Sequence, residues 1–118
     1  MNTKEILSRY AAGQRDFRNL NLMAVNFRNV NLSGINLSGA NLTKANLTKA
    51  NLRDANLTDA ILTGATLTDT NFTQANLTNA NLSGTNLDEA MLRQTYLKGA
   101  ILPEKTPTPI SSLNSPPA

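Results

Sequence analysis

A five-residue repeat runs from Asp16 to Leu102 without interruption. One position in each repeat, called the centre here, holds Leu or Phe in all eighteen repeats. An α-helix turns about 500° over five residues and would spread the centres around its surface. A strand would point successive centres to opposite faces. Each repeat is therefore expected to be a short extended piece that ends in a bend. The centres are Phe17, Leu22, Phe27, Leu32, Leu37, Leu42, Leu47, Leu52, Leu57, Leu62, Leu67, Phe72, Leu77, Leu82, Leu87, Leu92, Leu97 and Leu102.

The residues around each centre fit this arrangement. From the second repeat on, the residue two places before the centre is small or aliphatic, most often Ala. On an extended piece it points to the same side as the centre. The two residues after the centre would turn the corner, and each repeat would form one side of a coil. Coils stacked about 4.8 Å apart would pair their backbones. Residues that suit turns hold the second corner position at Gly34, Gly39, Gly64, Gly84, Gly99, Asp54, Asp59, Asp69 and Asn79.

Three repeats carry Thr at the inward small position, namely Thr70, Thr85 and Thr95. A buried hydroxyl without a partner costs about 1–3 kcal/mol. We therefore expect these hydroxyls to donate to backbone carbonyls of the coil.

The segments Ala-Asn-Leu-Thr-Lys, Ala-Asn-Leu-Arg-Asp and Ala-Asn-Leu-Thr-Asn resemble the pentapeptide-repeat family, whose pattern is Ala-(Asp/Asn)-Leu-X-X. The resemblance covers about residues 15–102. It implies an all-β solenoid, a right-handed quadrilateral β-helix with four repeats in each coil and about four to five coils. With its N-terminal segment, the chain is similar to short members of the family that are abundant in photosynthetic bacteria.

The two ends of the repeat region differ. Residues 1–14 are expected to form a capping helix, because Asn2 and Glu5 resemble a capping box and Gly13 is a suitable stop. Residues 103–118 contain five prolines, which preclude a regular ladder, and are expected to form a flexible tail. The apolar face of the predicted helix consists of Ile6, Leu7, Tyr10 and Ala11, and the first coil has the large inward residues Leu20, Val25, Val30 and Ile35.

The last three repeats suggest a contact surface. Asn directly precedes the centre in 12 of the repeats, but Met91, Tyr96 and Ile101 hold this outward position in the last three. Exposed apolar residues at an uncapped end are typical of an interface. The tail could fold over them, or two copies could form a homodimer through the C-terminal coil, as some pentapeptide-repeat proteins do. Met91, Tyr96 and Ile101 are the candidate interface.

The composition argues against catalysis and cofactors. The chain has no Cys and no His, so the commonest metal ligands and the commonest general base are missing. Asp69, Asp88 and Glu89 form the only local acidic group, but Lys49 lies in the same predicted ladder, so we expect a solvated corner and no metal site. No segment resembles a membrane span or a signal peptide, which predicts a cytoplasmic location.

The sequence thus predicts a non-catalytic structural or protein-interaction module whose partner is unknown. The resemblance also implies an alternative, a DNA mimic that modulates a type II topoisomerase. A net charge of +3, with Lys44, Lys49 and Arg53 in mid-rod, disfavours it. Ice binding is disfavoured because the outward Thr ladders are short and interrupted. Nucleic-acid or other polyanion binding is disfavoured because the chain lacks a dense basic stripe with stacking aromatics.

Overall fold

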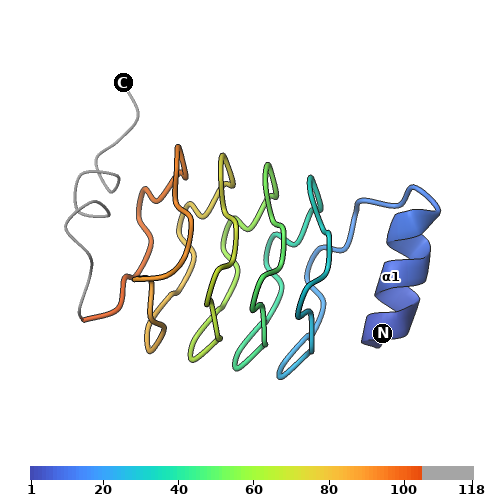
Figure 1. The fold of residues 1–118 in the computed structure, drawn as a ribbon, viewed down its shortest axis with the longest axis horizontal. Coiled ribbons are helices and arrows are strands. Elements are labelled where there is room, and N and C mark those ends of the chain that lie inside the picture. The colour runs from blue at the N-terminus through green and yellow to red at the C-terminus, as the bar shows by residue number, and fades with distance from the viewer. Residues whose placement is uncertain (105–118) are drawn as a thin grey trace.

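The computed structural model describes residues 1–104, so most of the predicted tail lies outside the described residues. A single helix in this part of the chain, α1 (Thr3–Ala11), lies at one end of a stack of coils (Figure 1). Parallel bridges join sides of the coil to the sides 20 residues further on, as between Asp16 and Asn36 or between Asn81 and Ile101. Because the chain bends once per five-residue repeat, each coil has four sides.

The sides contribute isolated bridges, not long strands. Two of the five residues in each repeat form the corner, which leaves little extended backbone for pairing. The stack is nevertheless bonded at every level. The N–H of Leu37 donates to the carbonyl oxygen of Asn56 at 2.8 Å, and the N–H of Gly39 donates to that of Thr58 at 2.9 Å. The N–H of Asn56 donates back to the carbonyl oxygen of Ile35 at 2.9 Å. These three bonds recur along the coil and hold neighbouring turns together.

The corners are type II turns. In a typical corner the N–H of Ala40 donates to the carbonyl oxygen of Leu37 at 3.0 Å, and Gly39 has a φ of 69°. The second corner residue has a positive φ at every corner from Asn19 to Gly99 with the exception of Glu89. The prediction from Gly, Asp and Asn is confirmed. The structure also places residues such as Lys44 in this region, although a side chain there costs roughly 1–2 kcal/mol.

Glu89 marks an irregularity in the last coil. The N–H of Asp69 donates to the carbonyl oxygen of Glu89 at 3.0 Å, whereas the regular pattern would use the carbonyl of Asp88. Within residues 1–104, no bridge joins Thr66 to Asn86. The ladder is therefore interrupted on one side of the coil.

Centres and inward small residues together form the core. Sixteen of the eighteen centres are buried, and the other two, Leu92 and Leu102 in the last coil, are partly buried. Burial of each Leu side chain contributes roughly 1.5–3 kcal/mol. The three inward threonines donate to carbonyl oxygens as predicted: Thr70 to Leu47 at 2.7 Å, Thr85 to Leu82 at 2.7 Å and Thr95 to Phe72 at 2.8 Å.

Asn before the centre has a structural role that the sequence analysis missed. All twelve of these Asn side chains accept a hydrogen bond from the backbone N–H two residues further on. In one such pair, Asn31 Oδ1 accepts from the N–H of Ser33 at 3.1 Å. The side chain thereby satisfies a corner N–H, as Asn commonly does in turns.

Helix α1 has defined signals at both ends. Asn2 Oδ1 accepts from the N–H of Glu5 at 2.9 Å. At the other end, the N–H of Gly13 donates to the carbonyl oxygen of Tyr10, and that of Gln14 to Arg9, both at 3.0 Å. These two bonds form a Schellman motif. No helix within residues 1–104 is long and apolar enough to cross a membrane.

Candidate interaction surface at the C-terminal coil

Helix α1 closes the N-terminal end of the coil with apolar contacts. Ile6 is buried, and Leu7 and Tyr10 pack partly buried against the core. Ala11, predicted on the same face, is exposed at the last residue of the helix. The guanidinium of Arg15 lies 3.7 Å from the centre of the Tyr10 ring, which covers the outer face of this aromatic side chain.

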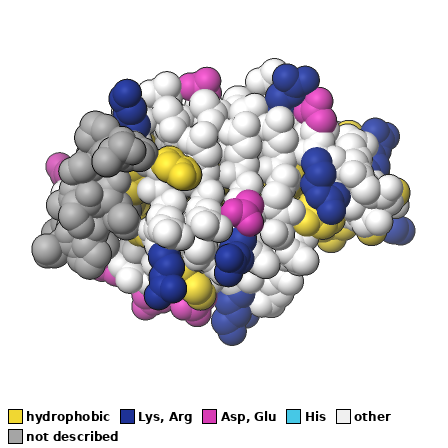
Figure 2. Space-filling model, turned by 90° about the horizontal axis from the view of Figure 1, so that it is seen from above, with side chains coloured by type: hydrophobic (Ala, Val, Ile, Leu, Met, Phe, Trp, Pro, Cys, Tyr) yellow, Lys and Arg dark blue, Asp and Glu magenta, His cyan; other side chains and the backbone are white. Residues whose placement is uncertain are grey.

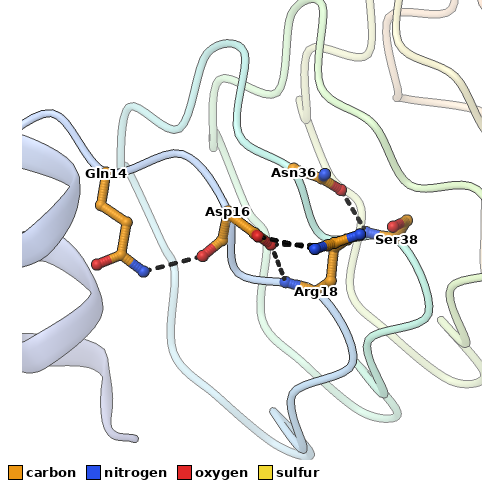
Figure 3. Close-up of polar contacts among 5 residues, drawn as sticks. All are labelled: Gln14, Asp16, Arg18, Asn36 and Ser38. Carbon is orange, nitrogen blue, oxygen red and sulfur yellow. Dashed lines mark hydrogen bonds and ion pairs between the residues drawn. The ribbon is translucent and has the colours of Figure 1, made fainter.

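Polar side chains of the N-terminal segment also satisfy carbonyls of the first coil. Tyr10 Oη donates to the carbonyl oxygen of Ser33 at 2.5 Å, and Thr3 Oγ1 to that of Asn26 at 3.4 Å. Gln14 Nε2 donates to the carbonyl oxygen of Asp16 at 2.9 Å (Figure 3). Three carbonyls at this end of the backbone ladder therefore have side-chain partners.

Asp16 starts the ladder of outward residues and has the same role as Asn. Its Oδ1 accepts from the backbone N–H of Arg18 at 3.2 Å and from Arg18 Nε at 2.9 Å, while Oδ2 accepts from Nη2 at 3.0 Å. One coil further on, Asn36 accepts from the N–H of Ser38 in the same way (Figure 3). The Arg18 side chain, and then its backbone N–H, lower the pKa of Asp16. This is the only ion pair within residues 1–104.

The C-terminal end is different. Met91, Tyr96 and Ile101 are 49%, 45% and 55% exposed. Their bridges to Asn71, Asn76 and Asn81 place them on three different sides of the last coil, a separation that follows from the four-sided coil. A partner that lies flat against one side can contact one of them. A partner that approaches the end of the coil can contact all three.

These apolar residues stand at positions where the coil below has Asn, whose side chain accepts a corner hydrogen bond. Asn71 and Asn76 accept from the N–H groups of Thr73 and Thr78, both at 3.0 Å. Met91 and Tyr96 carry no amide oxygen at this position, and the corresponding N–H groups of Arg93 and Lys98 donate to no side chain within residues 1–104. Ile101 precedes Pro103, which has no N–H to satisfy. Within residues 1–104, the last coil thus lacks two of the corner hydrogen bonds and presents apolar surface instead.

The last coil also presents backbone N–H groups at its outer edge. In the coil below, the N–H groups of Phe72 and Gln74 donate to the carbonyl oxygens of Met91 and Arg93 at 2.8 and 2.9 Å. The equivalent N–H groups of Leu92 and Gln94 have no acceptor within residues 1–104. A hollow lies at the step where the coil ends, lined by Ser83, Gly84, Thr85, Asn86, Asp88, Leu102, Pro103 and Glu104. Apolar side chains and backbone donors therefore occur together at this end.

Between the two ends of the rod, Ile61 is the only exposed large hydrophobic residue among the described residues. On the face shown in Figure 2, acidic and basic side chains lie among uncharged ones, in places side by side, and the exposed apolar side chains in mid-rod are isolated. Among the described residues, no group of three or more acidic side chains is placed to hold a metal ion.

Comparisons with known proteins agree with the repeat pattern. The family model for pentapeptide repeats matches eight copies over residues 21–59 and 65–102. A pentapeptide repeat protein from the thylakoid lumen of Arabidopsis thaliana is similar, with 30% identity and a TM-score of 0.64 over 73% of this chain and 66% of that one. One from Nostoc PCC 7120 has 30% identity and a TM-score of 0.53 over 96% of this chain and 93% of that one.

A third solved structure has higher identity and lower structural similarity. HetL, a pentapeptide repeat protein of Nostoc PCC 7120 involved in heterocyst differentiation regulation, has 41% identity and a TM-score of 0.43 over 85% of this chain. The chain spans 66% of the length of the Arabidopsis protein and 46% of the length of HetL. No curated protein matches this chain.

Proposed function

This chain belongs to the pentapeptide repeat family, and we propose that it is a non-catalytic module that binds another protein through the end of its last coil. The observation that carries the proposal is the exchange of Asn for Met91 and Tyr96 in the last coil. There the chain loses two corner hydrogen bonds and gains exposed apolar side chains. Exposed apolar residues beside backbone donors are suited to contact with a protein.

The partner approaches along the axis of the coil. Only this direction brings Met91, Tyr96 and Ile101 into one interface, because they lie on three sides. The N–H groups of Leu92 and Gln94, which have no acceptor within residues 1–104, then face the partner and can donate to its carbonyls, as sheet edges do. A second copy of this chain, the homodimer predicted from the sequence, is one such partner. We also propose that the coil is right-handed. This handedness rests on the family, because the bridges determine only that paired residues are 20 positions apart.

A DNA mimic fits the described surface less well. Imitation of a duplex requires closely spaced negative charge along the rod, because the groove of the enzyme is built for phosphates. Lys44, Lys49 and Arg53 lie on three successive corners in mid-rod, and all three side chains are exposed. Unchanged supercoiling by a type II topoisomerase at micromolar protein is the expected result.

The test compares the wild-type chain with the double variant Tyr96→Glu/Ile101→Glu. Met23→Glu is the control, because Met23 is 53% exposed but lies at the opposite end of the coil. Both substituted proteins should melt like the wild type. Sedimentation in about 0.5 M salt, which screens surface charge, then measures self-association. A dimer that the double variant loses and the control keeps identifies a second copy as the partner.

If all three proteins are monomers, affinity capture from a lysate of the source organism follows. A protein retained by wild type and control but lost by the double variant supports an interaction with a different partner. Equal retention by all three proteins, or no retention, overturns the proposal that this end is the binding surface.

A further inference from the structure

Corners 20 residues apart stack into a column along the rod, and such a column is called a corner from here on. One corner carries basic residues in its first half and acidic residues in its second half. Arg28 and Lys49 lie in the first two coils, and Asp69, Asp88 and Glu89 lie in the next two. We call these five residues the polarised corner. The basic residues are nearer α1, and the acidic residues are nearer the C-terminal end. All five side chains are exposed.

The other corners have no such separation of charge. The corner that begins with Arg18 has Asp59 and then Lys98 further up, so its sign alternates. The corner with Arg53 has Asp54 beside it and Arg93 two coils later. Separation of the two signs is therefore specific to the polarised corner.

Within residues 1–104, the charged groups of the polarised corner form no ion pair. The only ion pair within residues 1–104 joins Arg18 to Asp16. Asp69 and Glu89 lie on successive coils, where like charges repel, and Asp88 is adjacent. An outside surface with the opposite order of charge would relieve this repulsion.

A second copy of the chain presents the opposite order of charge when its rod lies antiparallel to the first. A two-fold axis that passes between the second and third coils exchanges coil one with coil four and coil two with coil three. Arg28 of each copy then faces Asp88 of the other, and Lys49 faces Asp69. Both pairings join equivalent corner positions, so the two edges match without a shift in register. Such an interface is isologous, as in most homodimers.

We propose that the polarised corner is a self-association surface through which two copies pair side by side and antiparallel. The proposal does not depend on the end contact proposed above, because the corner runs along the rod. Exposed ion pairs are individually weak and are screened by salt. The dimer is therefore expected at low ionic strength and high protein concentration.

A charge swap tests the proposal. The variant Arg28→Glu/Lys49→Glu has an entirely acidic corner, and the variant Asp69→Lys/Asp88→Lys has Lys in place of two of the three acidic residues and keeps Glu89. Each variant alone should be monomeric at about 0.02 M salt. Mixed in equal amounts, they should form a heterodimer that weakens at least about tenfold at about 0.5 M salt. Sedimentation of the mixture and of each component measures this directly.

Lys44→Glu/Arg53→Glu is the matched control, since it makes the same change in net charge at two other corners. This control should self-associate like the wild type at low salt. Failure of the two swapped variants to associate overturns the proposal. Equal loss of association in the control also overturns it, because net charge alone would then explain the effect. Association that persists at high salt belongs to the end contact.

Discussion

Asn41 Oδ1 accepts two hydrogen bonds from Thr43, one from its backbone N–H at 3.1 Å and one from its hydroxyl at 2.6 Å. One coil further on, Ile61 holds the position of Asn41 and offers no acceptor to Thr63. Asn41→Ile should therefore lower the free energy of unfolding by about 0.5–1.5 kcal/mol, the usual contribution of a hydrogen bond. Chemical denaturation of the two proteins measures the difference.

The reverse substitution in the same ladder is the control. Ile61 is 40% exposed, so Ile61→Asn removes little buried apolar surface and supplies the missing acceptor. It should leave stability unchanged or raise it by up to about 1 kcal/mol. Loss of stability in both variants would show that the identity of the side chain at this position matters through packing and not through the corner bond.

Glu89→Gly should repair the interrupted ladder. Gly adopts a positive φ without steric cost, and the substitution removes a carboxylate that lies one coil above Asp69. The bridge between Thr66 and Asn86 can then form, and the backbone N–H of Leu67 should exchange more slowly with solvent. Hydrogen exchange followed by NMR measures this rate.

Gln94→Gly is the matched control for this repair. Gln94 already has a φ of 56°, so Gly there should relieve strain of roughly 1 kcal/mol without a change at Leu67. Equal protection of Leu67 in wild type and Glu89→Gly would contradict the assignment of the interruption to Glu89.

The sequence predicts which side chains of each repeat point into the coil. Centres and inward small residues two places apart identify the inside, and the structure buries Leu52 and Ala50 accordingly. The number of sides in each coil cannot be predicted in this way, because a period of five fits three or four sides equally well. That number came from the family resemblance, and the bridges between residues 20 apart agree with it.

The role of Asn before the centre could not be predicted from the pattern. An outward Asn is compatible with a solvated side chain and with a corner acceptor, and the choice depends on the backbone angles of the turn. The irregular corner at Glu89 could not be predicted from the pattern either. Lys44 adopts a positive φ of 60° and Glu89 does not, although neither residue favours that region. The separation of Met91, Tyr96 and Ile101 onto three sides likewise required the coil geometry.

Tyr10→Phe should loosen the N-terminal cap without a change in the coil. The substitution removes the bond from Tyr10 Oη to the carbonyl oxygen of Ser33 and keeps the ring that packs against the core and against Arg15. The expected loss is about 0.5–1.5 kcal/mol, together with faster hydrogen exchange in α1. Exchange that rises equally in the central coils would mean that the bond supports the entire stack.

Asp16 should make the stability of the first coil sensitive to acid. The side chain of Arg18, followed by its backbone N–H, holds the pKa of Asp16 below its ordinary value of 3.8. Since the pKa is lower in the folded chain, the carboxylate stabilises the fold above the unfolded value, and this contribution is lost as the pH falls below about 3.8. Asp16→Asn keeps an acceptor for the N–H of Arg18, as Asn36 does for Ser38, but removes the ion pair.

Thermal melts of wild type and Asp16→Asn from about pH 7 to about pH 2 isolate this effect, because the other carboxyl groups are common to both proteins. The wild type should be slightly more stable at neutral pH, since the pair is exposed to solvent and weak. The difference should disappear at the acidic end of the range, where Asp16 is protonated. A difference that stays constant with pH would mean that the substitution acts through the corner N–H, and that the Arg18 pair adds nothing to the stability of the first coil.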